Sequence, residues 1–315
     1  MSKILITGGN GFLGKYLALK LKGENDVFLA SRNNKQNLAA KNITGCPIFP
    51  MDISNINSVR DVFSEVRPEV VIHAAATKFV DLSEKFPMET IDVNVVGSQN
   101  ICRVSIENNV SYVVGVSTDK AAPPIRNIYG MTKGLMEKMF CLMNGKTDTN
   151  FSCVRYGNVA WSTGSVLPIW KKMFDTDGVI GTTGPEMRRF FFTVDDAVNL
   201  VCCALENKDL VSGKVLSKKM KSAQINDLLD TWISTFGGSW KTIDGRPGER
   251  QDEFLIGESE VPFCEEKEFC GEKYFVLDQN KKSSSPIESS FSSFDAERLS
   301  KSEMETLIRN IPAHA

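Results

Sequence analysis

The stretch Ile4-Leu5-Ile6-Thr7-Gly8-Gly9-Asn10-Gly11-Phe12-Leu13-Gly14 decides the fold of this chain. A short apolar run leads into glycines at positions 8, 11 and 14, and leucines at 13, 17 and 21 follow at helical spacing. Gly8 permits a sharp turn, Gly11 lets the backbone approach a pyrophosphate, and Gly14 lets the helix pack close to the strand. The N-terminus of that helix offers free N–H groups to phosphates. The sequence therefore predicts a strand, a tight turn and a helix that together bind a dinucleotide.

Two other interpretations of this stretch are weaker. A glycine-rich turn can arise by chance, but a strand before it and a helix after it make this the less favoured interpretation. Residues 9–15 also nearly match a nucleotide-binding P-loop, which needs Ser or Thr after its lysine. Tyr16 stands at that position and offers no hydroxyl of the right reach for Mg²⁺. We therefore reject the P-loop.

Composition excludes several classes of partner. The net charge of −2 gives no reason to expect nucleic acid or an anionic membrane as a partner, and no apolar run reaches the roughly 18 residues that span a bilayer. We expect no signal peptide, because the first apolar residues form the predicted strand. The eight cysteines lack Cys-x-x-Cys spacing and mostly lie in apolar segments, which indicates buried thiols and a cytoplasmic location. A metal site at Cys264 and Cys270 is improbable without nearby histidines, so we predict none.

Strands and helices alternate along the first half of the chain. This rhythm predicts an α/β fold with a doubly wound parallel sheet of the Rossmann type and a smaller C-terminal lobe that binds the substrate. We assign 1–159, with 190–212, to the cofactor-binding domain, 160–189 and 213–281 to the lobe, and 282–315 to a tail. The expected strands cover 26–30, 46–49, 70–76, 111–116 and 151–155, and the expected helices cover 89–107, 129–143 and 194–205.

The end of the second strand bears on cofactor choice. Ser31 and Arg32 stand where an acidic residue would contact a free ribose 2′-hydroxyl, so we favour NADP over NAD. The alternative for Arg32 is an ordinary solvated loop charge. Asp52 follows the third strand and either accepts a hydrogen bond from adenine or caps the helix that begins near Ser54.

The fourth strand runs into Ala74, Ala75 and Ala76, whose small side chains leave room for a ligand at the edge of the sheet. His73 in this strand is more consistent with a structural role than with a catalytic one. Asn94 lies inside the helix expected at 89–107. Such an asparagine usually faces solvent, although it could also bind backbone groups or water near the active site.

Two groups of polar residues follow the strand at 111–116. Thr118, Asp119 and Lys120 come at its end, and Tyr129 and Lys133 lie four apart on one face of the next helix. The alternatives are a solvated Asp-Lys pair in a loop and a helix with incidental aromatic and basic residues. The position of both groups after one buried strand favours catalysis.

These motifs together resemble the extended short-chain dehydrogenase/reductases, and more narrowly the nucleotide-sugar 4,6-dehydratases that act on UDP-N-acetylglucosamine. The resemblance covers nearly the whole chain, and the Asp119-Lys120 pair is its most specific element. It departs at 121–127, which is longer than in the family, and at 160–163, where the usual Gly-Ser-Arg is replaced. The matching motifs are Thr7-Gly8-Gly9-x-Gly11-x-x-Gly14, His73-Ala74-Ala75-Ala76-x-Lys78, Ser117-Thr118-Asp119-Lys120-Ala121, Tyr129-x-x-x-Lys133, Arg155-Tyr156-Gly157-Asn158-Val159, Gly164-Ser165-Val166-x-Pro168, Met187-x-Arg189-Phe190-Phe191 and Arg246-Pro247-Gly248-Glu249.

The resemblance implies a full set of site residues. The catalytic residues are Thr118, Asp119, Lys120, Tyr129 and Lys133. The substrate contacts are Lys78, Asn158, Ser165, Val166, Arg189, Arg246 and Glu249. The cofactor contacts are Thr7, Gly8, Asn10, Gly11, Phe12, Leu13, Gly14, Ser31, Arg32, Asp52, Ile53, Ala74, Ala75, Ala76, Lys78, Asn94, Tyr129 and Lys133.

The implied reaction is redox-neutral: a hydride leaves sugar C4 for NADP⁺, water is lost across C5 and C6, and the hydride returns to C6. Tyr129 is the expected base for the C4 hydroxyl, with its pKa lowered by Lys133 and by the nicotinamide charge, and Thr118 bonds the same hydroxyl. Lys120 is the expected base at C5, which requires a lowered pKa, and Asp119 the expected acid at the C6 hydroxyl. Both must lie in a dry pocket beside the nicotinamide.

Three alternatives share the predicted fold. A nucleotide-sugar epimerase and a 5,6-dehydratase would use the same cofactor half and differ after oxidation at C4. A non-catalytic NADP-binding regulatory protein is an alternative of another class, but it would have no use for Thr118, Tyr129 and Lys133. The partners implied are a nucleotide-sugar substrate and further copies of the chain in a homo-oligomer.

Overall fold

The glycine-rich stretch forms the predicted strand, turn and helix in the computed structural model, which describes residues 1–32, 34–245, 248–269 and 271–314. Strand β1 (Lys3–Thr7) leads into helix α1 (Phe12–Leu21). Gly8 takes a φ of +69°, which side chains disfavour. A Cβ on Gly14 would lie 2.5 Å from the carbonyl oxygen of Gly8, so α1 approaches the turn at a distance that only glycine allows.

The largest sheet confirms the predicted parallel, doubly wound architecture. Its strands from β3 to β6 follow the order of two mononucleotide-binding halves that meet between β1 and β4. All neighbours in this part are parallel. Across the sheet the order is β14 (Cys264–Phe269), β15 (Glu272–Leu277), β10 (Val215–Lys218), β6 (Asn150–Val154), β5 (Tyr112–Val116), β4 (Val70–His73), β1, β2 (Asp26–Ser31) and β3 (Ile48–Pro50).

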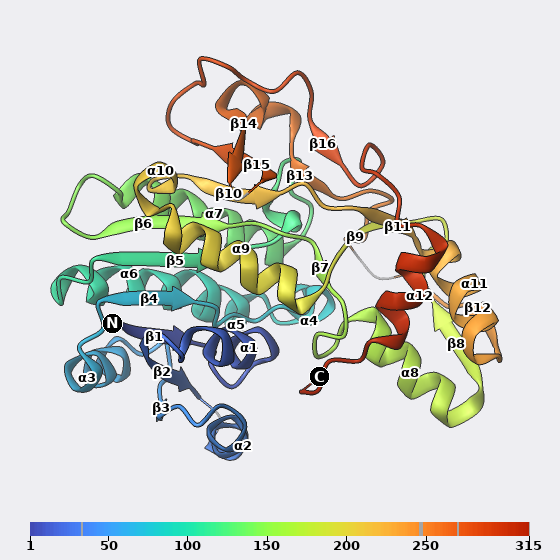
Figure 1. Cartoon of the computed structure of the whole chain (residues 1–315), viewed down its shortest axis with the longest axis horizontal. Coiled ribbons are helices and arrows are strands. Elements are labelled where there is room, and N and C mark those ends of the chain that lie inside the picture. The colour runs from blue at the N-terminus through green and yellow to red at the C-terminus, as the bar shows by residue number, and fades with distance from the viewer. Residues whose placement is uncertain (33, 246–247, 270, 315) are drawn as a thin grey trace.

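Helices cover both faces of this sheet (Figure 1). On one face α1 packs against α9 (Val194–Glu206) and α2 (Asn34–Thr44). On the other face lie α3 (Ile56–Val66), α6 (Gly97–Glu107) and α7 (Ile128–Met143). Successive residues of β1 enter different cores: Ile4 and Ile6 join one, and Leu5 joins the other. A strand buried on both faces needs a continuous apolar run, which is what the sequence shows.

Three strands that we expected in the substrate-binding lobe extend the large sheet instead. β10 pairs parallel with β6, β15 pairs antiparallel with β10, and β14 pairs antiparallel with β15. The large sheet therefore continues past residue 213, where the sequence predicts that the second segment of the lobe begins. Val215 and Leu216 are fully buried in opposite cores and so continue the pattern of the central strands.

The remaining elements form a second part of the molecule beside the carboxyl ends of the parallel strands (Figure 1). Its core is aromatic, with Trp170 and Trp232 in edge contact at 6.2 Å between ring centroids. Its small sheets are β11-β9-β7, β12-β8 and β13-β16. The elements are β7 (Asn158–Val159), α8 (Val166–Asp177), β8 (Val179–Thr182), β9 (Arg188–Phe192), β11 (Ser222–Gln224), α11 (Ile225–Phe236), β12 (Ser239–Thr242), β13 (Phe254–Ile256), β16 (Phe291–Ser292) and α12 (Lys301–Arg309).

The C-terminal segment is more ordered than the expected irregular tail. Ser300 and Glu303 form a capping box that begins α12, and this helix packs against α11. The indole N–H of Trp161 donates to the carbonyl oxygen of Leu307 at 2.8 Å. Further on, Lys15 in α1 donates to the carbonyl oxygen of His314 at 2.8 Å, so this segment contacts both parts of the molecule.

The helix expected at 89–107 forms in three pieces. α5 (Pro87–Ile91) continues into a π-helical turn, η1 (Asp92–Val96), and then into α6. Such turns are uncommon and often occur at functional sites. Among the described residues no helix combines the length and apolar character needed to cross a membrane. The other short elements are α4 (Val80–Lys85), η2 (Asp119–Ala121), α10 (Lys208–Val211) and η3 (Glu258–Phe263).

Candidate active site

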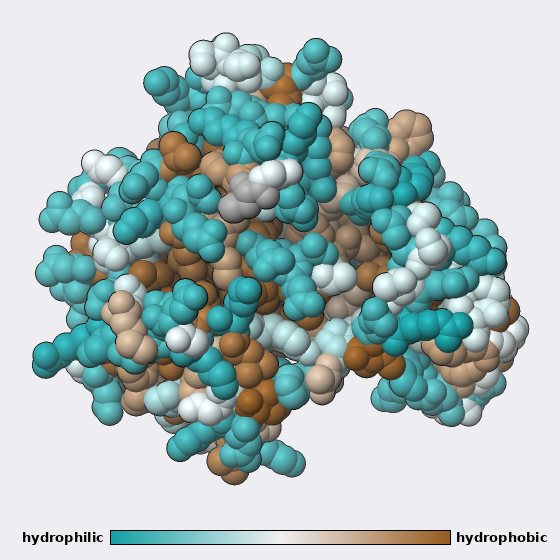
Figure 2. All heavy atoms as spheres, viewed as in Figure 1, coloured by the Kyte–Doolittle hydropathy of each residue, from teal (hydrophilic) through white to brown (hydrophobic). Residues whose placement is uncertain are grey.

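A cavity of about 700 Å³ lies between the carboxyl ends of the parallel strands and the second part of the molecule. The surface is hollowed between these two parts (Figure 2). Thr7, Asp52, Asn94 and Asp119 lie outside its lining, and Arg246 lies outside the described residues. The predicted site residues that line it are Gly8, Asn10, Gly11, Phe12, Leu13, Gly14, Ser31, Arg32, Ile53, Ala74, Ala75, Ala76, Lys78, Thr118, Lys120, Tyr129, Lys133, Asn158, Ser165, Val166, Arg189 and Glu249.

The glycine turn and the end of β4 form one floor of the cavity. A Cβ on Gly8 would lie 2.8 Å from the backbone nitrogen of Ala75, so these two backbone segments approach each other more closely than any residue but glycine allows. Gly11 precedes α1 without a side-chain cap, which leaves the first N–H groups of the helix available to an anion. These features fit a pyrophosphate in the cradle.

His73 has the structural role that its sequence context indicated. Its Nδ1 lies 2.8 Å from Thr7 Oγ1 and its Nε2 lies 3.0 Å from Ser98 Oγ. Thr7 Oγ1 also accepts the backbone N–H of Ala75 at 3.2 Å. Burial, with a smaller contribution from the charge of Lys133, lowers the pKa of His73 to about 3. The neutral imidazole therefore ties β1 to β4 beneath the cavity.

The end of the cavity at which the sequence predicts the adenosine is built from polar side chains near the glycine turn and after β2. Ser31 Oγ donates to Asn10 Oδ1 at 2.7 Å, and Asn10 Nδ2 donates to Asn37 Oδ1 at 2.8 Å. Arg32 is exposed and lines the cavity. A cationic side chain at this edge suits a phosphate on the ribose.

Asp52 lies beside this region but turns to its own loop. Its Oδ1 accepts the backbone N–H of Ser54 at 3.0 Å and the hydroxyl of Ser54 at 2.7 Å. The cap of α3 is Asn55, whose side chain accepts from the N–H groups of residues 57 and 58. Asp52 thus shapes the loop before the helix without being its N-cap.

Asn94 is buried in the π-helical turn and does not face solvent. Its Oδ1 accepts the N–H of Thr77 at 2.8 Å and its Nδ2 donates to the carbonyl of Thr77 at 2.9 Å. Nδ2 also donates to Thr132 Oγ1 at 3.0 Å. Of the roles we weighed, the structure gives Asn94 the backbone-binding one, since it fixes the loop that carries Lys78.

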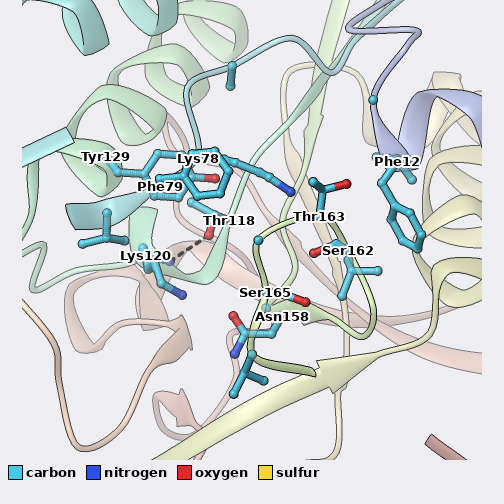
Figure 3. Close-up of a pocket in the computed structure, with 18 of the residues that line it drawn as sticks. Phe12, Lys78, Phe79, Thr118, Lys120, Tyr129, Asn158, Ser162, Thr163 and Ser165 are labelled. Carbon is cyan, nitrogen blue, oxygen red and sulfur yellow. Dashed lines mark hydrogen bonds between the residues drawn. The ribbon is translucent and has the colours of Figure 1, made fainter. Parts of the chain in front are cut away.

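The catalytic candidates come together at the end of β5. Thr118 caps the short helix η2, and its hydroxyl donates to Asp119 Oδ1 at 3.0 Å. Lys120 Nζ donates to the same oxygen at 3.0 Å. Asp119 is completely buried, with Oδ2 unbonded among the described residues, so the pair is not a solvated loop pair. Figure 3 shows Thr118, Lys120 and Tyr129 entering the cavity opposite Asn158 and Ser165.

The protonation state of Lys120 differs from our expectation. Burial acts to lower the pKa of Lys120, but the negative charges of Asp119 and Glu253 outweigh burial and raise it. Lys120 is therefore an ammonium in this structure and not the neutral amine that a base at C5 requires. Our prediction overlooked the second carboxylate, because Glu253 is remote in the sequence.

Tyr129 also differs from the expected electrostatics. Burial raises the pKa of Tyr129 to about 12, and the charge of Lys120 and a hydrogen bond with Thr118 offset only part of that effect. The lowering effect comes from Lys120 and not from the expected Lys133. Burial lowers the pKa of Lys133 itself to about 8. The protein's own groups thus leave Tyr129 a neutral phenol.

The candidate substrate contacts lie around the other end of the cavity. Arg189 is held by the carbonyl oxygens of Arg188 at 2.8 Å and Arg250 at 2.8 Å. Burial lowers the pKa of Lys78 to about 8. Glu249 accepts the hydroxyl of Thr183 at 3.2 Å.

Several buried charged residues were given no role in the sequence analysis. Glu253 lines the cavity next to Lys120, and Arg250 is 5% exposed with Nε and Nη1 unbonded among the described residues. Arg155 is completely buried and forms bidentate pairs with Glu137 at 2.6 and 2.9 Å and with Glu260 at 2.8 Å. These residues sit in no periodic pattern, so only the proximity of Glu253 to the Arg-Pro-Gly-Glu motif could have drawn attention to it.

Residues that could hold a metal are not gathered in one place: the described ranges contain no cluster of three or more histidine, cysteine, aspartate or glutamate side chains suited to an ion. Cys270 lies outside those ranges. The other cysteines are all buried, as we expected of their apolar segments.

Comparison with known proteins relates the chain to enzymes of sugar metabolism. Residues 4–273 match the family described as "Polysaccharide biosynthesis protein". UDP-N-acetylglucosamine 4,6-dehydratase (inverting) from Campylobacter jejuni is 34% identical over 80% of this chain and 77% of its own length. UDP-glucose 4-epimerase from Rickettsia bellii is 31% identical over 98% of this chain and 95% of its own.

The fold has a close counterpart among solved structures. The X-ray structure of Pen from Bacillus thuringiensis superposes with a TM-score of 0.88 at 26% identity, over 98% of this chain and 96% of that one. The architecture of the second part of the molecule is therefore shared along with the parallel sheet.

Proposed function

Since the chain belongs to the polysaccharide biosynthesis protein family, as an enzyme of the nucleotide-sugar dehydratase type, we propose that it is an NADP-dependent 4,6-dehydratase of UDP-N-acetylglucosamine. The product is a 4-keto-6-deoxy sugar nucleotide, and the enzyme is a hydro-lyase. The relative from Campylobacter jejuni, at 34% identity, carries this activity in its name.

The observation that carries the proposal is the buried Asp119-Lys120 pair beside Thr118 and Tyr129. Hydride transfer at C4 needs a tyrosine, a lysine and a hydroxyl, and all three line or border one cavity. A second acid and amine have no task in that step alone. An elimination across C5 and C6 needs one group to remove a proton and another to protonate the leaving hydroxyl, and Lys120 and Asp119 provide both chemistries.

The cavity fits a nicotinamide dinucleotide. A Cβ on Gly8, Gly11 or Gly14 would lie 3.0 Å or less from neighbouring backbone atoms. Glycine at these positions leaves the turn open, which supports close contact between its backbone and a pyrophosphate. Arg32 and Ser31 support a 2′-phosphate and hence NADP over NAD. When bound, the oxidised cofactor would supply positive charge to the site and would serve as the acceptor of the C4 hydride and its donor at C6.

The chain's own residues then divide the proton transfers. Tyr129 takes the proton of the C4 hydroxyl while Thr118 hydrogen-bonds the same oxygen. The C4 ketone makes the C5 hydrogen acidic, and Lys120 removes it once its amine is neutral. Asp119 protonates the C6 hydroxyl, which leaves as water. The Asp119 carboxylate, which pairs with Lys120 here, must first gain that proton, and the proton that leaves the C4 hydroxyl balances it over one turnover. Lys120 returns a proton to C5 as the hydride reaches C6, so electrons and atoms balance with the loss of one water.

The substrate is held at the far end of the cavity. Arg189, with its planar and permanently charged guanidinium, suits a diphosphate, and Lys78, Asn158, Ser165, Val166 and Glu249 complete the proposed contacts. The sequence assigns Arg246 to the same set, but it lies outside the described residues. Work on a nucleotide sugar fits a cytoplasmic enzyme.

A homo-oligomer is supported by apolar residues that remain exposed on neighbouring helices. α7 packs against both α4 and α5, and these elements and the link between them carry large exposed side chains. Burial of such a group against a second copy would stabilise a dimer. The residues are Leu82, Phe86, Met88, Ile91, Met131, Leu135 and Leu142.

An epimerase is the second candidate, because the relative from Rickettsia bellii spans 98% of this chain. The test is incubation of the purified protein with a panel of UDP-, GDP-, CDP- and dTDP-sugars, followed by product mass and proton NMR at C5. We expect UDP-N-acetylglucosamine to lose the mass of one water and to gain a ketone. A product of unchanged mass with inverted C4 would establish the epimerase instead.

A further inference from the structure

A second carboxyl group, that of Glu253, approaches the Asp119-Lys120 pair from a distant part of the chain. Lys120 Nζ lies 3.0 Å from Asp119 Oδ1 and 3.8 Å from Glu253 Oε1. The side chains of Asp119 and Glu253 are 0% and 4% exposed, so both carboxyl groups are out of water. Glu253 and Lys120 both line the cavity, whereas Asp119 lies outside its lining.

The backbone of Glu253 is held on both sides. Its N–H donates to Ser293 Oγ at 3.1 Å, and its carbonyl accepts the N–H of Ser293 at 2.8 Å. The residue directly precedes β13, and β13 packs against η2, the short helix that contains Asp119 and Lys120. The Glu253 side chain therefore reaches Lys120 because of the fold and not because of local flexibility.

The charges around this group leave Glu253 without a complete partner. Its Oε2 forms no hydrogen bond within the described residues, and the nearest cation on that side, Arg250 Nη1, is 3.9 Å away. The charged or titratable groups that face Lys120 and Glu253 are Asp119, Tyr129, Arg189 and Arg250. Burial raises the pKa of Glu253, so this carboxyl is suited to hold a proton.

We propose that Glu253 is a positioning residue for Lys120: it shares the ammonium group with Asp119 and takes one proton from it, which leaves the neutral amine that removes the C5 hydrogen. This inference rests on the dehydratase reaction proposed above. One N–H bond of Lys120 breaks, one O–H bond of Glu253 forms, and no electrons are transferred. The buried ion pair becomes a neutral pair, which a dry pocket favours once a ketone substrate has displaced water.

The first test is the titration of Lys120 in the full-length protein saturated with NADP. Lysine labelled with ¹³C at Cε is followed by NMR, and the Lys120 signal is assigned by its loss in Lys120→Arg. Glu253→Gln removes the negative charge that stabilises the ammonium group, so we expect the pKa of Lys120 to fall by about one pH unit or more. Glu253→Asp keeps the charge and holds the value near that of the wild type. Glu268→Gln, on the exposed side of β14, is the matched control.

An unchanged titration of Lys120 in Glu253→Gln would overturn the inference. This result does not depend on turnover. If the wild type forms no dehydrated product while the titration shifts as expected, the reaction assignment fails and the electrostatic hold of Glu253 on Lys120 stands.

The second test is the pH profile of dehydration with UDP-N-acetylglucosamine. Without an internal acceptor, Lys120 must release its proton to bulk water. We therefore expect dehydration by the wild type to change little with pH while Glu253 is ionised, and dehydration by Glu253→Gln to rise about tenfold per pH unit until Lys120 is neutral. Glu253→Asp should restore the wild-type profile. A loss of the same size at every pH would show that Glu253 only supports the fold of the site, and the proton-accepting role would fall.

Discussion

The two ends of the cavity treat buried polar groups in opposite ways. At the cofactor end, Thr7, His73 and Ser98 form a neutral chain in which both imidazole nitrogens have a partner. At the catalytic end, Asp119 Oδ2 and Glu253 Oε2 remain without hydrogen bonds among the described residues, and both lie next to a buried ammonium group. A fully hydrogen-bonded neutral network makes a fold rigid. Charged groups with unused hydrogen-bonding atoms are instead typical of sites that transfer protons. The hydrogen bonding thus distinguishes the end of the cavity that supports the fold from the end at which we propose the reaction.

The sharpest way to break this contrast is to neutralise the catalytic end. We expect Lys120→Met and Asp119→Asn each to lower dehydration about 1,000-fold, because either the proposed C5 base or the proposed C6 acid is gone. Both should still bind the cofactor and accumulate its reduced form with UDP-N-acetylglucosamine, which nicotinamide fluorescence reports. Lys171→Met, at an exposed surface pair, is the control. Full turnover by either active-site variant would remove the mechanism.

A substitution at the cofactor end should act through the fold. Gly8→Ala places a Cβ 2.8 Å from the backbone of Ala75 at a φ of +69°, so we expect a loss of about 3 kcal/mol in the free energy of unfolding together with weaker cofactor binding. Urea unfolding and cofactor titration measure both. Gly145→Ala also has positive φ but meets no neighbour, so it should cost less. Equal losses in the two variants would mean that the close approach to Ala75 is irrelevant.

The neutral chain predicts its own pH dependence. His73 has a folded pKa of about 3, well below its ordinary value near 6.5, so protonation favours the unfolded state as the pH falls from about 6.5 towards 3. We expect the wild type to lose about 2 kcal/mol of stability between pH 7 and pH 5 from this residue alone. His73→Gln should be less stable at pH 7 but should lack that part of the slope. Parallel pH curves for the two proteins would show that His73 does not titrate on unfolding.

The smallest effect is expected at the exposed edge of the cofactor site. Arg32→Glu replaces a cation with an acidic residue where a ribose phosphate would lie, so NADP affinity should fall about tenfold relative to NAD. Isothermal titration with both dinucleotides gives the ratio. Because Arg32 is exposed, stability should stay unchanged. An unchanged ratio of NADP to NAD affinity would show that Arg32 is a solvated side chain with no contact to the cofactor.

The scaffold was readable from the sequence because its signals are local. Glycines at 8, 11 and 14 and the apolar run before them predicted a strand, a turn and a helix, and all three are present. The helix beginning near Tyr129 was also predicted, since its pattern is periodic. Strand β10 and helix α12 were misassigned because a short strand and a weakly apolar helix gain most of their stability from tertiary packing.

The charge state of the site was not readable, because it depends on contacts between distant positions. Thr118, Asp119 and Lys120 could be chosen from their place after a buried strand. The raised pKa of Lys120 depends on Glu253, 133 positions later in the sequence, which no local pattern connects to it. The same holds for Asn94, whose backbone partners at Thr77 exist only because the loop folds over the π-helical turn.

The buried Arg155 has a consequence for motion in this enzyme. It joins Glu137 in α7 to Glu260 in η3 and also donates to the carbonyl of Leu255 in β13. Arg155 directly follows β6, so this one buried cation links the end of that strand to the helix that bears Tyr129 and to the segment that bears Glu253. Any motion that keeps these pairs intact must move α7, η3 and β13 together, so Tyr129 and Glu253 would keep their positions relative to each other.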